Sequence, residues 1–517
     1  MGFYNNNMFY TALCLGIVLL HVVWVKLLPQ KLSIIQKDER NRLVEVVFCV
    51  CTALAVSTLF RLFPGNNRFP TEDSSVFLYI GERMTEGGIP YRDFFDHKGP
   101  MLYFVEFLGI LLSKTGYTGV WLLEVCNILI TVFLMLELGR LVSDRASSIL
   151  LGILLCVGIC GWRVWQGGNF TEEYALPWIT LAALTFFSFF QTGLYRRNEI
   201  ILLGAGFMVV FLLRANMTAI WVALMPVVLV LFVKKKRYLD TLKCMFLFLI
   251  GATIVLVPVL FYAMWTKSLD AMWQNYIVFN VSYSDAAASI SESLRLLLFF
   301  IRVLWPGAVA VVITLLFQPK SKVLWANLLF FIVSLFFVTL SGRGYYHYAI
   351  VLLPALILPF TVLFDLTDKF LRNGNNLTSR PGVIIASSLL ILAAAFVYRG
   401  ISAAPEPDDP IVEYIQEQTS EDDDVLILGN SCWYYLMTGR KTENRFFYQL
   451  PPAEISKEIY DGFINELTEH PSKLVVLPGV SIERELVDIS LNGIRERLFE
   501  KGYTSDEHDE FEAFWLR

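Results

Sequence analysis

Long runs of apolar residues follow one another along most of this 517-residue chain, and they constrain its fold more than any other feature. Hydrophobic residues make up 56% of the chain and charged residues only 17%, a composition far from that of a soluble globular domain. A helix of about 20 apolar residues can cross the hydrocarbon layer of a bilayer. The sequence therefore predicts an all-α polytopic membrane protein.

Twelve runs are long enough, or nearly long enough, to span a membrane. Two of them, 147–162 and 199–214, are short enough to be re-entrant instead. The twelve runs lie at about residues 8–28, 43–62, 118–138, 147–162, 174–192, 199–214, 217–233, 240–264, 295–317, 323–340, 346–365 and 382–399. We expect about twelve transmembrane helices in the cell membrane.

The basic residues in the connections between these runs predict the orientation of the chain. The connections on one side hold about twice as many Lys and Arg residues as those on the other side. Since connections rich in Lys and Arg stay in the cytoplasm, both termini and the connection after the second run are predicted to be extracytoplasmic. A re-entrant run would reverse the sidedness downstream of it, unless a second run also failed to span.

The composition changes abruptly after the last apolar run, and this change predicts the domain layout. Residues 401–517 contain two short buried strands, DDDVLILGN and SKLVVLPG, and two helical patterns, at 408–418 and 452–468. We expect a small extracytoplasmic α/β domain here. It follows a membrane core at 43–400, which is preceded by an additional transmembrane helix and cytoplasmic loop at 1–42.

A polar, aromatic loop interrupts the apolar runs at residues 71–100, TEDSSVFLYIGERMTEGGIPYRDFFDHKGP. Its many charges cannot lie in hydrocarbon, and connections of this length usually have a function or a structure of their own. The loop ends at Lys98, immediately before the apolar run 101–113. That run is too short to span and contains Glu106, so we expect an interfacial helix packed beside the loop.

Two charged positions at the ends of apolar runs are candidates for chemistry. Glu172 and Glu173 begin the run near residue 174, where two adjacent carboxylates are unusual, although ordinary interfacial charges would look the same. Arg214 interrupts an apolar stretch, where an unpaired cation costs a few kcal/mol. It needs an anionic partner such as a lipid-linked phosphate, or it extends to the membrane surface from the end of a short span.

A third candidate is the stretch SGRGYYHY at residues 341–348. The guanidinium of Arg343 can bind a phosphate through two parallel hydrogen bonds, and His347 and Tyr348 follow closely. The tyrosines also fit an interfacial aromatic belt, and His347 also fits a structural histidine.

These features resemble the GT-C glycosyltransferases, and in particular the family 39-type branch of protein mannosyltransferases and the lipid A aminoarabinose transferase. The first extracytoplasmic loop of that branch, here 63–117, runs from an Asp through a Gly and a Pro-Tyr turn to a Lys-containing motif. The matching residues are Asp73, Gly88-Ile89-Pro90-Tyr91 and Asp96-His97-Lys98-Gly99-Pro100-Met101. This chain departs from the branch in having His-Lys-Gly-Pro in place of Lys-Pro-Pro, and one additional span before the usual first helix.

The resemblance implies a membrane glycosyltransferase. Such an enzyme moves a sugar from a polyprenyl-phosphate donor to an extracytoplasmic glycan, lipid or protein acceptor, with inversion. It implies Asp73 as the base and Glu172 or Glu173 as a second acidic residue. The residues that it implies for the donor phosphate are Lys98, Arg214, Arg343, His347 and Tyr348. Some GT-C enzymes use a divalent cation, which Asp73 with Glu172 or Glu173 could hold; no other cofactor is expected.

Two other classes of function fit parts of the sequence. A transporter or flippase of lipid-linked saccharides would bind phosphate through the same cations, but transporters usually place charges near the bilayer midplane and contain internal repeats. A membrane scaffold that presents the C-terminal domain would leave the first-loop motif unexplained. The net charge of -5 gives no reason to expect a nucleic-acid partner.

Overall fold

The computed structural model describes residues 39–64, 69–281, 290–340, 342–372, 387–391, 393–395, 409–479 and 491–517. The first predicted span, most of the last one and the predicted boundary after residue 400 lie outside these residues. The chain forms two compact units. Unit 1 comprises Met1–Phe63, Trp121–Pro258 and Ala287–Ser402, and unit 2 comprises Pro64–Val120, Val259–Ala286 and Ala403–Arg517.

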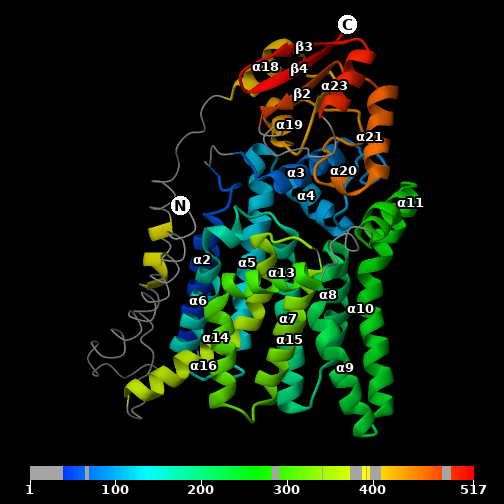
Figure 1. Ribbon diagram of the computed structural model, residues 1–517. Helices are drawn as coiled ribbons and strands as arrows, with labels where there is room; N and C mark the ends of the chain where they lie inside the picture. Colours follow the sequence, from blue (N-terminus) through cyan, green and yellow to red (C-terminus); the bar gives the residue numbers. More distant parts are fainter. Residues whose placement is uncertain are drawn as a thin grey trace. The chain divides into compact units, whose positions relative to one another are not determined.

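Unit 1 is built from long apolar helices (Figure 1). Proline and glycine at several helix ends, and the apolar runs themselves, determine where these helices begin and end. The elements are α2 (Glu39–Ser57), α5 (Thr118–Gly139), α6 (Ala146–Trp165), α7 (Thr171–Thr192), α8 (Arg197–Leu213), η2 (Ala215–Met217), α9 (Ala219–Lys234), α10 (Tyr238–Trp265, which enters unit 2 at Val259), α13 (Ile290–Val303), α14 (Trp305–Phe317), α15 (Lys322–Thr339), η4 (Tyr346–Leu352) and α16 (Leu353–Arg372).

Five helical segments among the described residues are long and apolar enough to cross a membrane. They are Thr115–Gly139, Thr171–Thr192, Tyr238–Trp265, Lys322–Thr339 and Tyr346–Lys369, and a sixth would be the bent pair Ser291–Val303 and Trp305–Phe317. These segments identify a multi-pass membrane protein, whereas the number of twelve spans stays a prediction.

The run 295–317 is not the single straight helix that its hydropathy suggested. It forms α13 and α14, whose axes differ by 84°. Leu304 leaves the helical conformation, with φ -110° and ψ 26°, and Pro306 lies in the first turn of α14. A proline has no backbone N–H and is well tolerated only at the beginning of a helix, so a new helix begins here.

Helices α8 and α10 pack with their backbones in close contact. A Cβ atom on Gly204 would lie 2.0 Å from the carbonyl oxygen of Phe248, and one on Gly251 would lie 1.9 Å from that of Ile201. Small residues at facing positions allow this approach, as they do in other membrane helix pairs.

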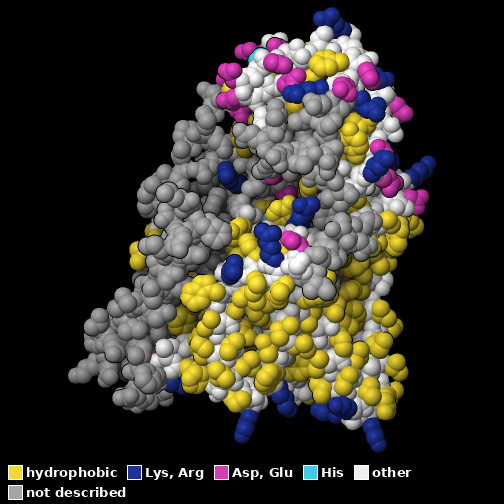
Figure 2. All heavy atoms as spheres, viewed as in Figure 1, with side chains coloured by type: hydrophobic (Ala, Val, Ile, Leu, Met, Phe, Trp, Pro, Cys, Tyr) yellow, Lys and Arg dark blue, Asp and Glu magenta, His cyan; other side chains and the backbone are white. Residues whose placement is uncertain are grey.

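The outer side of unit 1 carries the surface expected for contact with lipid. Only 17% of the most apolar window of α10 is buried, against 89% for the segment that contains α16. Figure 2 shows hydrophobic side chains over α9, α10, α14 and α15, with Lys and Arg gathered where α9 leads into α10 and α14 into α15. These connections belong to the set that the sequence assigns to the cytoplasm; the sidedness itself stays a prediction.

Unit 2 combines the first loop with the C-terminal α/β region. Its helices are α3 (Glu72–Thr85), α4 (Pro100–Leu112), η1 (Thr115–Tyr117), α11 (Leu269–Met272), η3 (Trp273–Val278), α18 (Pro410–Gln418), α19 (Trp433–Thr438), α20 (Pro452–Ile455), α21 (Lys457–Glu469) and α23 (Leu491–Glu500). Its strands are β1 (Val425–Ile427), β2 (Leu474–Pro478), β3 (Tyr503–Glu507) and β4 (Phe511–Leu516).

The four strands form one mixed sheet in the order β1-β2-β4-β3 (Figure 1). Strands β1 and β2 are parallel, with Val425 opposite Leu474, and the other two pairs are antiparallel. Both predicted strands are therefore present. The predicted helix at 452–468 is divided into α20 and α21, because the side chain of Ser456 caps α21 by accepting a hydrogen bond from the amide of Ile459.

The first loop is part of the hydrophobic core of unit 2. Phe95 is fully buried, and its ring lies 5.4 Å from that of Phe446 and 5.8 Å from that of Phe279. Helix α4 corresponds to the short apolar run 101–113. Glu106, in the middle of α4, is buried against α3, where a Cβ atom on Gly81 would lie 2.7 Å from the Glu106 Cβ.

Candidate functional site

Asp73 is the second residue of α3, and another residue caps this helix. Thr71 is the N-cap, and its side chain accepts a hydrogen bond from the amide of Ser74 at 3.4 Å. Asp73 therefore does not cap α3. The half-buried Asp73 carboxylate lies in the first turn, where the helix dipole favours a negative charge.

The backbone of the His97-Lys98 motif is held by side chains of unit 2. Asn280 donates a hydrogen bond to the carbonyl oxygen of His97 at 2.7 Å, and the hydroxyl of Tyr91 donates one to the carbonyl oxygen of Lys98 at 2.7 Å. The Lys98 Nζ lies 3.3 Å from the His97 Nε2 and 5.8 Å from the ring centre of Phe77. Tyr91 itself has φ 66°, an uncommon conformation for a non-glycine residue that its hydrogen bond helps to maintain.

Asp96 is the buried acceptor at the centre of this motif. Its carboxylate accepts hydrogen bonds from the hydroxyls of Tyr448 at 2.6 Å and Tyr103 at 2.7 Å, and from the amide of His97 at 2.6 Å. Burial alone would raise the pKa of Asp96, but the hydrogen bond with His97, the charges of His97 and Lys98 and the hydrogen bond from Tyr448 together hold the pKa below its usual range. The carboxylate is therefore a fixed anion.

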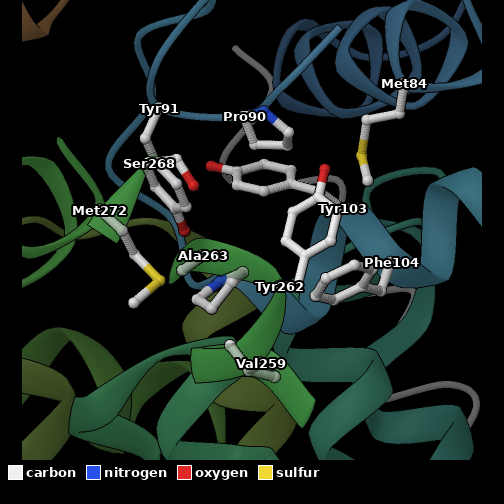
Figure 3. A pocket seen from close by; sticks show the side chains of 11 residues that line it. Met84, Pro90, Tyr91, Tyr103, Phe104, Val259, Tyr262, Ala263, Ser268 and Met272 are labelled. Atoms are coloured by element: carbon white, nitrogen blue, oxygen red, sulfur yellow. The ribbon is translucent and has the colours of Figure 1, made fainter. Parts of the chain in front are cut away.

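A small apolar hollow lies beside Tyr91 and Tyr103 (Figure 3). The rings of Tyr103, Phe104 and Tyr262 surround it, and Phe104 and Tyr262 meet edge to face at 5.1 Å between ring centres. The hydroxyl of Tyr103 binds Asp96 and that of Tyr91 binds the carbonyl of Lys98. Two hydroxyls of the lining are thus used to hold the motif.

In unit 1, the structure brings Arg214 together with Glu172 and Tyr348. Arg214 ends α8 in an extended conformation, and its guanidinium donates to the Glu172 carboxylate at 2.5 Å and to the Tyr348 hydroxyl at 2.7 Å. The guanidinium carbon also lies 4.1 Å from the ring centre of Tyr348, as in a cation–π contact. The hydroxyl of Thr171 donates to the second oxygen of Glu172 at 2.8 Å.

His347 is held next to this group by aromatic rings. Its ring stacks on that of Phe170 at 4.3 Å and on that of Tyr345 at 5.6 Å between centres. Its Nδ1 lies 2.7 Å from the Oε1 of Gln166. Because Gln166 Oε1 is an acceptor, Nδ1 carries the proton. Arg343 precedes η4 and is half-buried.

Glu173 belongs to a different group from Glu172, since consecutive helical residues point about 100° apart. The amide of Asn169 donates to Glu173 at 3.1 Å and to Glu124 at 2.6 Å, so these two buried carboxylates share one donor. Gly168, at φ 81°, makes this possible: a Cβ atom there would lie 2.5 Å from the Glu124 carboxylate. The sequence left the choice between Glu172 and Glu173 open; Glu172 is the one beside Arg214.

Several residues of these groups were not selected from the sequence. Asp96 stood within the quoted motif, but nothing marked it apart from its neighbours. Glu124 offered a clearer signal, because a carboxylate inside an apolar run is rare without a role. Tyr448 and Gln166 carried no local signal at all.

The residues suggested for a divalent cation are Asp73 with Glu172 or Glu173. Among the residues that the structure describes, no group of three or more His, Cys, Asp and Glu side chains is arranged to hold a metal ion. Both oxygens of Glu172 already accept hydrogen bonds, from Arg214 and Thr171. A cation at Asp73 with Glu172 or Glu173 stays a prediction.

Comparison with known families identifies the chain. The family model described as "Putative competence-induced protein Ccs4 N-terminal domain" matches residues 36–380, more than half of the sequence. The chain belongs to this family. No curated protein matches it.

Comparison with solved structures gives the fold. The crystal structure of ArnT from Cupriavidus metallidurans bound to undecaprenyl phosphate is similar with a TM-score of 0.60 over 90% of this chain and 97% of that chain, at 12% identity. The apo structure of the same protein gives 0.58 over 90% and 96%, also at 12% identity. The oligosaccharyltransferase from Archaeoglobus fulgidus reaches only 0.41, at 13% identity over 90% and 73%. The family member described here therefore has a fold similar to that of ArnT, in agreement with the resemblance that the first-loop motif suggested.

Proposed function

We propose that this protein is a membrane glycosyltransferase that moves a sugar from a polyprenyl-phosphate carrier to an extracytoplasmic acceptor. The observation that carries the proposal is the contact of Arg214 with Glu172 and Tyr348. It occurs in a chain with a fold similar to that of ArnT, whose crystal structure holds undecaprenyl phosphate. The sugar and the acceptor, whether glycan, lipid or protein, are left to experiment.

Arg214 is suited to bind the phosphate of such a carrier. Its guanidinium has five N–H donors, and the contacts to Glu172 and Tyr348 use two of them. The Arg214 side chain is 16% exposed while that of Glu172 is 3% exposed, so the cation can be reached and its counter-ion is covered. Positioned cations stabilise the charge that develops on a departing phosphate.

Four other candidates would assist at the phosphate. His347 and Tyr348 lie side by side in η4, with ring centres 4.7 Å apart. Arg343 precedes them in the chain. Lys98, in unit 2, presents its ammonium beside His97. In this proposal each contributes a donor or a positive charge to the carrier phosphate.

Asp73 is the proposed base. It takes the proton of the acceptor hydroxyl as the acceptor oxygen forms its bond to the anomeric carbon. The bond from that carbon to the phosphate oxygen breaks in the same step, and its electron pair leaves with the carrier phosphate. Attack from the opposite face inverts the anomeric centre. Glu172 holds Arg214 in place rather than acting as a second base.

The proposal is tested in cells and with purified protein. Mass spectrometry of envelope glycans, lipids and proteins, with the gene present and deleted, should show one sugar missing in the deletion. Purified protein in lipid nanodiscs should bind undecaprenyl phosphate, and Lys98→Ala should weaken binding about ten- to a hundredfold, as expected for the loss of one charge-assisted contact. An unchanged envelope together with no binding of this lipid would refute the proposal.

A flippase of lipid-linked saccharides would bind the same lipid but form no glycosidic bond. Transfer by the purified protein separates these two functions, because a flippase would leave the saccharide on its carrier and form no product with the acceptor. No contact among the described residues favours the flippase.

A further inference from the structure

We propose that Tyr448, in the C-terminal region, is a positioning residue for Lys98. In this way the C-terminal region helps to build the first-loop motif. The inference rests on the proposed function in one respect, that Lys98 binds the carrier phosphate. Tyr448 is separated from Asp96 by 352 positions in the sequence, and its hydroxyl donates to the Asp96 carboxylate at 2.6 Å.

Residues 441–448 lie along the first loop and contact it at several points. The amide of Phe95 donates to the carbonyl of Arg445 at 2.9 Å, and the Arg445 guanidinium donates to the carbonyl of Tyr91 at 2.9 Å. The hydroxyl of Tyr79, in α3, accepts a hydrogen bond from the amide of Thr442 at 3.1 Å. Tyr448 ends this segment and supplies its contact to the motif.

The buried Asp96 carboxylate links Tyr448 to the backbone of His97. It is 1% exposed, and its oxygens accept from two tyrosine hydroxyls and one backbone amide. A general base needs a lone pair that can reach the substrate, and these contacts leave Asp96 unsuited to that role. Because Asp96 immediately precedes His97 in the sequence, its fixed carboxylate instead holds the backbone that leads to Lys98.

Two tyrosines therefore hold the motif from different elements. Tyr103, on α4, binds Asp96 at 2.7 Å and also donates to the carbonyl of Lys98 at 3.3 Å. Tyr448 binds the other oxygen of Asp96. Burial and then the negative charge of Asp96 raise the pKa of Tyr448 far above its usual range, so its hydroxyl remains a donor. Without Tyr448, the carboxylate keeps its contacts to Tyr103 and to the His97 amide but loses the one from the C-terminal region, so the orientation of His97 and Lys98 is less firmly fixed.

The test compares Tyr448→Phe with Tyr503→Phe in the full-length protein. Tyr503 is a matched control, because its hydroxyl is also buried in unit 2 and donates to the carbonyl of Ser472. Two quantities are measured in nanodiscs: the Kd for undecaprenyl phosphate, and the rate at which an amine-reactive reagent acylates Lys98, read by mass spectrometry. Thermal unfolding of each variant shows whether both remain folded to the same degree.

We expect Tyr448→Phe to raise the Kd about tenfold, the loss typical of a hydrogen bond to a charged group, and to change the acylation rate of Lys98 severalfold. Tyr503→Phe should change neither quantity, although it should lower the unfolding temperature similarly. Equal effects of the two variants would overturn the inference, because they would mean that Tyr448 acts only on stability.

The two readouts distinguish failure of this inference from failure of the proposed function. If the unaltered protein binds no undecaprenyl phosphate and its deletion leaves the envelope unchanged, the proposed function fails, and the acylation rate of Lys98 alone decides the inference. An acylation rate that Tyr448→Phe leaves unchanged would overturn it in either case.

Discussion

Arg214 donates a hydrogen bond to Glu172 at 2.5 Å, and both side chains are largely buried in unit 1. They come from the end of α8 and the first turn of α7, which are 42 residues apart in the sequence. Breaking a buried ion pair by removing one partner costs about 3–5 kcal/mol, because the other charge is left without compensation. Because this cost arises only when one partner is removed and the other remains, removing both partners separates the structural role of Arg214 from its role in binding.

The first prediction compares Arg214→Gln with the double variant Glu172→Gln/Arg214→Gln. The single variant should lose about 3–5 kcal/mol of stability, and the double variant should recover much of it, since no charge stays buried. Both should bind undecaprenyl phosphate about ten- to a hundredfold more weakly than the unaltered protein. Thermal unfolding and lipid titration in nanodiscs measure the two effects.

A surface ion pair provides the control. Arg237 donates to Asp240 at 2.7 Å, but both side chains are about one-third exposed, and such pairs contribute only about 0–1 kcal/mol. Arg237→Gln should therefore alter neither stability nor lipid binding measurably. If the double variant at Glu172 and Arg214 restored lipid binding together with stability, Arg214 would be a structural residue and not a phosphate ligand.

The second prediction concerns the dependence of stability on pH. The pKa of Asp96 is lowered in the folded protein, so the folded state binds this proton less tightly than the unfolded chain does. Its contribution to stability is complete above about pH 3.9, the ordinary value for Asp, and is lost progressively as the pH falls toward the folded-state pKa. The Asp96→Asn variant has no carboxylate at this position that could be protonated at low pH.

We therefore expect the unfolding temperature of the unaltered protein to fall more steeply below about pH 4 than that of Asp96→Asn. Thermal unfolding between pH 7 and pH 3 measures the difference. Parallel curves would mean that the hydrogen bonds from Tyr103 and Tyr448 do not favour the charged form of Asp96.

The third prediction concerns topology. Reporter fusions after residues 145 and 236 should show a cytoplasmic location, because both lie in basic connections, and a fusion after residue 404 should show an extracytoplasmic one. Cytoplasmic signal from the last fusion would contradict the predicted sidedness of the C-terminal region.

Much of the fold could be predicted because the physical signal was local. Apolar runs indicate membrane helices wherever they occur, and the first-loop motif from Asp73 to Lys98 indicated the GT-C fold. The break between α13 and α14 was also visible in principle, because Pro306 follows a tryptophan in the middle of the run. Hydropathy averages over such a position and therefore hides it.

The side-chain groups could not be predicted because their members are distant in the sequence. Nothing in the neighbourhood of Tyr448 indicates that its hydroxyl binds Asp96. The pairing of Arg214 with Glu172 rather than Glu173 depends on the rotation of α7, and one residue of rotation would exchange them. Single-sequence patterns determine which face of a helix is apolar, but not which buried polar side chains meet.

The last prediction tests Asp73 as the base. Asn fits the space of Asp and gives up only the dipole interaction of a charge in the first turn, about 0.3–1 kcal/mol, but it cannot take a proton. Asp73→Asn should therefore reduce sugar transfer about a hundred- to ten-thousandfold while expression and undecaprenyl phosphate binding persist. The measurement is transfer by purified protein from the polyprenyl-phosphate sugar that the envelope experiment identifies.

Two variants at neighbouring residues serve as controls for this test. Thr71→Ala removes the N-cap of α3 and should cost about 0.5–2 kcal/mol of stability, with transfer nearly unchanged, because the cap is distinct from the proposed base. Glu72→Gln removes an adjacent carboxylate that points about 100° away around the helix, and it should also have little effect on transfer. If Asp73→Asn behaves like these two variants, Asp73 is not the base. The acceptor proton must then go to another carboxylate, and Glu172 is the first to test, since its side chain lies beside the proposed phosphate ligand Arg214.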